Sequence, residues 1–172
     1  MSDAFAGFWV ALGEGVVGGV VTSLIWFAIA RRFRPRISVS PKLAWDGKHT
    51  WVKLINKSPR AVVDLQVAID VVTPRSAKGG IWFQTHAVKI VGTIPVFIPP
   101  DRKKGDDDNA YRFMLDLDPN DLFTSDSVSA LRFRLFARDE VSGVGKLIEQ
   151  EFSHRSEVVS GEFEKGESFD IS

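Results

Sequence analysis

An apolar run from Phe5 to Ala30 constrains this chain more than any other feature, and Glu14 is the one ionisable side chain among its 26 residues. At about 1.5 Å per residue, a helix over this run is roughly 39 Å long, whereas the hydrocarbon layer of a bilayer is ~30 Å thick. The run therefore predicts a single transmembrane helix, with the lipid bilayer as its surroundings.

The charges that flank the run predict its orientation. Four Arg lie within residues 31–36, and no basic residue precedes the run. Since positive residues stay on the cytoplasmic side, we expect a single-pass protein of the inner (plasma) membrane with its N-terminus outside. A cleaved signal peptide is the alternative, because Ala28-Ile29-Ala30 resembles a cleavage site. The uncleaved anchor is favoured, because signal peptides have a basic start and only about 7–15 apolar residues.

Small residues gather on one face of the expected helix. At about 100° per residue, that face carries Gly7, Ala11, Glu14, Gly15, Gly18 and Thr22. Lipid gives helices no hydrophobic reason to associate, so they meet where small residues let their backbones approach. We therefore expect a homo-oligomer through this face, with the bulky face toward lipid.

Glu14 is the costly residue of this helix. An ionised carboxylate inside a bilayer costs at least ~2.5 kcal/mol unless it lines water, pairs or takes up a proton. A ring of Glu14 side chains around an oligomer axis would satisfy it and would favour cations in a pore. The alternative is that Glu14 lies shallow, near the outer headgroups, and has no role.

From Ile37 onward the period of the apolar residues changes from that of a helix to that of strands. We expect strands at 37–45, 50–56, 62–73, 80–84, 87–98, 110–117, 128–139 and 146–154, and one helical turn at 119–123. Within 62–72, the alternation predicts that Val63, Leu65, Val67, Ile69 and Val71 share one face. This pattern predicts an antiparallel β-sandwich of immunoglobulin-like type or a small β-barrel.

The chain thus divides into three parts. Residues 1–36 form the membrane helix with its Arg collar, and residues 37–156 form a cytoplasmic β-domain. Residues 157–172 form an acidic tail that is either frayed or added at a sheet edge.

Motifs for catalysis are missing from the sequence. There is no Cys, and His49, His86 and His154 are scattered without the spacing of a zinc site. The chain has 22 basic and 22 acidic residues, so any anion-binding surface must be local. We therefore expect a protein that is not an enzyme and holds no metal or cofactor.

A local basic face is predicted on the strand at 128–139. Arg132, Arg134 and Arg138 share that face, Lys146 begins the next strand, and Lys53 with Trp51 joins from a neighbouring strand. Guanidinium groups beside an exposed aromatic ring can bind the phosphate and base of a nucleotide or oligonucleotide. The alternative is an ordinary solvated face on which partners such as Glu149 and Glu151 neutralise the arginines.

The apolar run Phe5–Ala30, the collar RRFRPR at 31–36 and the strand-rich remainder resemble the small bacterial membrane effectors of nucleotide-signalled antiviral defence. Members of that group with two spans are familiar, whereas this chain has one. The resemblance implies an oligomer whose β-domains bind the nucleotide signal and open a pore. Glu14, Gly15 and Gly18 would then line or pack the pore, and the three arginines would contact the signal.

Two other functions remain open. The protein could be a membrane-tethered adaptor, whose sandwich edge binds a partner protein by strand addition. It could also be a subunit of a larger membrane complex, in which Glu14 pairs with a basic residue of another chain.

Overall fold

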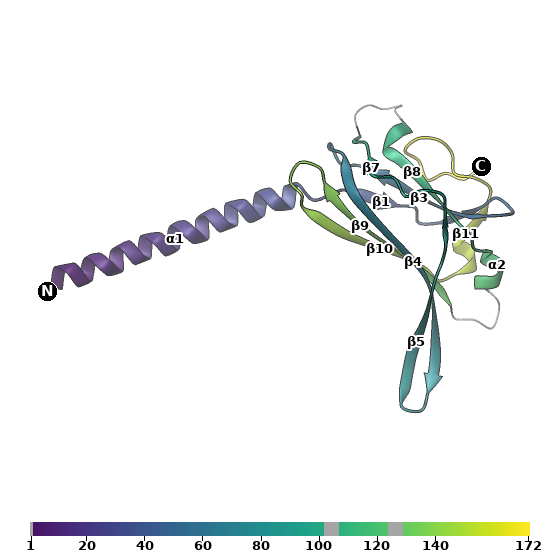
Figure 1. The fold of residues 1–172 in the computed structure, drawn as a ribbon, viewed down its shortest axis with the longest axis horizontal. Coiled ribbons are helices and arrows are strands. Elements are labelled where there is room, and N and C mark those ends of the chain that lie inside the picture. The colour runs from purple at the N-terminus through teal and green to yellow at the C-terminus, as the bar shows by residue number, and fades with distance from the viewer. Residues whose placement is uncertain (1, 102–106, 124–128) are drawn as a thin grey trace. The chain divides into compact units, whose positions relative to one another are not determined.

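The computed structural model describes residues 2–101, 107–123 and 129–172, and for residues 2–14 and 107 it describes the backbone alone. The chain divides into two compact units, Met1–Arg34 and Pro35–Ser172. The first unit is helix α1 (Ser2–Arg32). The second is mostly β-structure with a short helix and two 3-10 turns (Figure 1).

Helix α1 ends where the sequence requires. Arg31 and Arg32 occupy its last turn, where positive charge complements the helix dipole. Pro35 then disfavours helical backbone for the residue before it. Gly15–Arg32 is long and apolar enough to cross a membrane, judged by length and composition. Its large apolar side chains are exposed; Leu24, for example, is 63% exposed.

The second unit contains two sheets. Its strands are β1 (Ile37–Val39), β2 (Leu43–Trp45), β3 (Thr50–Asn56), β4 (Val62–Ala77), β5 (Gly80–Ala87), β6 (Ile90–Val91), β7 (Phe97–Ile98), β8 (Ala110–Leu115), β9 (Ala130–Asp139), β10 (Gly145–Phe152) and β11 (Val158–Ser160). Sheet A has the order β11-β2-β3-β8-β6, with β1 also paired to β3. Sheet B has the order β10-β9-β4-β5, with β7 also paired to β4. The helix α2 (Pro119–Leu122) and the 3-10 turns Asp107–Asn109 and Arg155–Glu157 lie between strands.

The two sheets pack through one apolar core, which gives a sandwich-like fold. Sheet A contributes Val52, Leu54 and Phe113, and sheet B contributes Phe133 and Leu135, all buried. The rings of Phe113 and Phe133 lie 5.9 Å apart across the layers. The two-sheet, sandwich-like arrangement expected from the sequence is therefore present, and the helical turn expected at 119–123 is α2.

The strands depart from the prediction in their bounds at two places and in their pairing at one. The strand expected at 37–45 is divided into β1 and β2, and the one at 87–98 contains only the short strands β6 and β7. Strand β11 pairs with β2 in parallel, so sheet A is not wholly antiparallel. The start of the strand expected at 128 lies outside the described residues.

A bulge in β4 corrects the predicted face of this strand. The register between β4 and β9 shifts between Val63 and Gln66, and Asp64 has a positive φ of 54°. The extra residue reverses the alternation. Val63 pairs with Arg138 on the outer side, whereas Val67 pairs with the buried Leu135. Val63 therefore does not share a face with Val67.

The acidic segment after residue 157 packs on sheet A. Strand β11 adds to β2, and Phe163 is only 3% exposed. Lys53 reaches this segment from β3: its Nζ donates to the main-chain oxygens of Glu164 and Ser168, at 2.7 Å each. Of the two arrangements expected for the segment, the structure has the one at a sheet edge.

Candidate functional site

The arginine face lies on the outer side of sheet B. Arg132 and Arg134 alternate along β9 with Phe133 and Leu135, which are fully buried. Because β9 stands between β10 and β4, side chains of both neighbours flank the arginines. The register places Glu151 opposite Arg132 and Glu149 opposite Arg134.

Each of these arginines has a carboxylate partner. Arg132 lies 3.5 Å from Glu149 and 3.4 Å from Glu151. Arg134 pairs with Asp70 of β4, and Arg138 lies 3.4 Å from Asp64 at the bulge. A phosphate that binds here must therefore displace carboxylates, as the solvated-face alternative implies.

The other members of the predicted basic face lie elsewhere. Lys146 pairs with the buried Ala137, so it lies at the end of β10 on the side opposite the arginines. Lys53 and Trp51 belong to sheet A. Lys53 is 1% exposed, and the Trp51 indole donates to Asp46 at 2.8 Å. The six predicted residues thus do not assemble into one platform.

The sequence did not reveal the structural role of Lys53 and Arg112, which occupy opposite positions on β3 and β8. Two like charges opposite each other are unfavourable unless acceptors separate them. Here the C-terminal segment supplies the acceptors, because Arg112 also donates to the main-chain oxygen of Phe163 at 3.1 Å. Tertiary packing decides this pairing, so the alternation alone could not reveal it.

A hollow of about 400 Å³ lies beside the arginines and is lined by residues of β4, β9 and β10 of sheet B. Its lining residues are Gln66, Val67, Ala68, Arg134, Phe136 and Leu147. Leu147 of β10 is 62% exposed. The Nε–H of Arg134 is buried and has no hydrogen-bond acceptor among the described residues. Buried donors are nearly always paired with protein or ordered water, so we expect water or another molecule to supply the acceptor for this donor.

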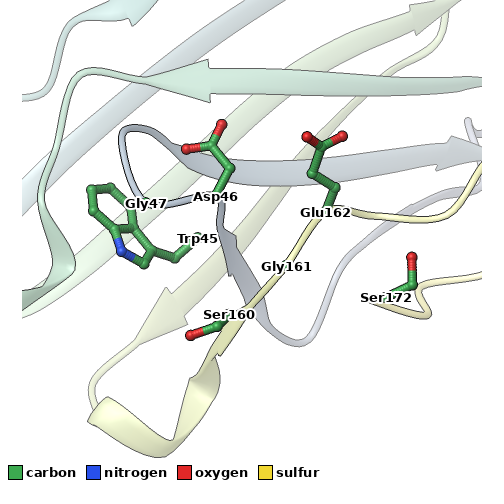
Figure 2. A pocket seen from close by; sticks show the side chains of 7 residues that line it. All are labelled: Trp45, Asp46, Gly47, Ser160, Gly161, Glu162 and Ser172. Atoms are coloured by element: carbon green, nitrogen blue, oxygen red, sulfur yellow. The ribbon is translucent and has the colours of Figure 1, made fainter.

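A second pocket, of about 660 Å³, lies where β2 meets β11. Figure 2 shows the carboxyl groups of Asp46 and Glu162 rising on the same side of this pocket. The main-chain N–H of His49 is the foremost cause that lowers the pKa of Asp46, and the Trp51 indole adds to it. Asp46 is thus engaged in holding the 46–49 turn, and Glu162 lies 4.0 Å from Arg112.

The predicted oligomer face of α1 is described only in part. Gly15 and Gly18 belong to α1, and a Cβ added at either would meet nothing within 4 Å. Thr22 is exposed on the same helix. For Gly7, Ala11 and Glu14 the structure describes the backbone alone.

Metal ligands do not cluster in the described ranges, where no group of three His, Cys, Asp or Glu could hold an ion. Comparison with protein-family models finds no match, and comparison with curated proteins finds none either.

Proposed function

We propose that the protein is a single-pass membrane-tethered adaptor, in which α1 anchors the chain and the sandwich binds an extended segment of a partner protein at β10. The anchor is supported by the apolar stretch Gly15–Arg32, and the four Arg that end it favour a cytoplasmic sandwich at the plasma membrane. Sandwiches of immunoglobulin-like type commonly serve as recognition modules, and we assign this domain to that class.

The observation that carries the proposal is the open edge of sheet B. Within the described residues β10 pairs with β9 alone, so its other side is free for a further strand. Ile148 packs against the core and Phe152 is buried within it, which holds the edge in place. A partner strand at β10 would gain main-chain hydrogen bonds and could insert an apolar side chain beside Leu147.

The charges on β10 indicate the chemistry of that partner. Glu149 and Glu151 are exposed along the edge strand, and charged edge residues discourage indiscriminate pairing. A matching strand would carry basic residues opposite these two acids. It would also bring a carbonyl or carboxylate oxygen to the Nε–H of Arg134.

A photo-crosslinking residue at position 147 tests the proposal in native membranes. Val141 provides the matched control, because it is also apolar and exposed (72%) but lies in the turn after β9. We expect one protein to crosslink from position 147 and not from position 141. Equal crosslinking from both positions, or none, would contradict the assignment of β10.

An oligomeric pore gated by a nucleotide signal is the second candidate, and a series of small residues along α1 favours it. Gly15, Gly19 and Ser23 succeed each other at intervals of four residues, the spacing at which helices pack closely in lipid. A pore predicts ion leakage from liposomes that contain the purified chain and its signal, and loss of the leakage in Glu14→Gln. The adaptor predicts no leakage from either protein.

A further inference from the structure

The hairpin of β4 and β5 continues beyond the sandwich (Figure 1). The pairing of β4 with β9 ends at Val72, whereas the pairing of β4 with β5 extends to Ala77 and Gly80. Residues 73–77 and their partners in β5 thus form a ribbon of two strands. An isolated two-stranded ribbon is at best marginally stable in water, so its exposed side chains require explanation.

The tip of this ribbon exposes three large apolar residues. Ile81, Trp82 and Phe83 are 69%, 51% and 65% exposed. Successive residues of a strand point to opposite faces. Phe83, opposite Pro74, therefore makes one face apolar, and Trp82, opposite Arg75, makes the other face aromatic.

The charge of the two-stranded ribbon is of one sign. Residues 71–100 contain no Asp or Glu but include Arg75, Lys78 and Lys89. Arg132, Arg134 and Arg138 of sheet B all have carboxylate partners. Within the described residues no ion pair joins Arg75 or Lys78 to a carboxylate, and the Nε–H of Arg75 donates to Oε1 of the neutral Gln84 at 3.3 Å. The tip thus presents positive charge that no carboxylate neutralises in the described residues, beside exposed aromatic rings.

We propose that this tip, with Ile81, Trp82 and Phe83, inserts into the headgroup layer of an anionic bilayer. A partner strand that pairs with the edge of β5 would leave both faces of the ribbon exposed to water. A groove on a partner protein would cover only one face. The headgroup layer of a bilayer is fluid and can surround both faces at once. Tryptophan and phenylalanine suit the interface of a bilayer, and basic residues are attracted by anionic headgroups.

The absence of Cys from the chain allows a direct test with one label. Ser76→Cys in the full-length protein places a fluorescent label beside Ile81, its partner in the register, and keeps all three apolar residues. Val141→Cys gives a matched label in the exposed turn after β9. Both proteins are reconstituted in nanodiscs of phosphatidylcholine, with or without phosphatidylglycerol, and quenched by spin-labelled lipids.

We expect lipid quenching of the label at position 76 to exceed that at position 141 severalfold in the anionic nanodiscs. Arg75→Gln with Lys78→Gln should reduce the quenching severalfold, and so should the triple variant Ile81→Ser, Trp82→Ser and Phe83→Ser. Equal quenching in the two lipid mixtures would overturn the role of the anionic headgroups. A label at position 76 that is shielded from an aqueous quencher but not quenched by lipid would show a protein contact and overturn the proposal. A label at position 76 that the aqueous quencher reaches freely would also overturn it.

Discussion

Replacement of Lys53 by Met removes the ammonium group that joins sheet A to the C-terminal segment. Lys53 is 1% exposed, and its Nζ lies 2.7 Å from each of two main-chain oxygens, those of Glu164 and Ser168. Met has a similar flexible stem, so the substitution deletes the charge and the hydrogen bonds with little change in packing.

The expected loss of stability follows from two opposed effects. Hydrogen bonds from a charged donor contribute about 1.5–3 kcal/mol each, so two contribute roughly 3–6 kcal/mol. The substitution also ends the desolvation of a buried ammonium, which costs several kcal/mol. Water can reach the freed oxygens in part, because both bonds are only partly buried. We therefore expect the free energy of unfolding to fall by about 1–3 kcal/mol.

Urea denaturation of the full chain in detergent measures this change, and hydrogen exchange locates it. Exchange should increase most at residues 161–170, for example at the Glu164 N–H that bonds to Asp170. Lys48→Met is the matched control, since it removes the same charge from an exposed position. Surface substitutions change stability by less than about 0.5 kcal/mol. A Lys53→Met effect no larger than that of the control would refute the reasoning.

Three further predictions concern the two pockets and the turn at Asp46. Gly161→Ala should increase the hydrogen-exchange rates of residues 161–172. Gly161 has a φ of +129°, and the new Cβ would lie 2.5 Å from the main-chain oxygen of Ser172. Unchanged protection from exchange would contradict this. Gly145→Ala should lower the free energy of unfolding by about 1–3 kcal/mol, because its Cβ would lie 2.6 Å from the ring of Phe136; a neutral effect in urea denaturation would show that the ring moves freely. The pKa of Asp46 is lowered from 3.8, so its contribution to stability is present above that pH and is lost as the pH falls below it. As the pH is lowered, the free energy of unfolding should therefore fall less steeply for Asp46→Asn than for the wild type. Identical slopes of this free energy against pH would oppose the lowered pKa of Asp46.

The sequence predicted the elements whose patterns are local. The apolar run predicted α1, and the alternation of Leu131, Phe133 and Leu135 with arginines predicted both faces of β9. The run of α1 is apolar along its length, and in β9 one strong period of two extends over the whole strand, so packing in the sandwich does not override the local pattern of β9.

The prediction was wrong where one residue changes the register. A strict period of two placed Val63 with Val67, but the bulge at Asp64 moves Val63 to the outer face. The residue with positive φ at the bulge is Asp64, and not a Gly that the sequence would have shown as a break in the strand. A bulge of this kind cannot be recognised from alternation alone.

Of the arginine face of sheet B, the sequence predicted only the part that belongs to β9. The arginines of β9 share a face as expected, but their partners Asp64 and Asp70 come from β4, more than 60 residues away in sequence. Lys53 has the alternation of an exposed strand residue, yet the C-terminal segment covers it. Neither contact can be predicted without the strand order, which the sequence does not contain.

Labelling of single cysteines tests most directly whether the chain crosses a membrane with its sandwich in the cytoplasm. Ser2→Cys and Val141→Cys are compared in intact cells, with a thiol reagent that cannot cross the membrane. We expect immediate labelling at position 2, and labelling at position 141 only after lysis. Labelling of position 141 in intact cells, or recovery of the protein in the soluble fraction, would contradict the tethered orientation.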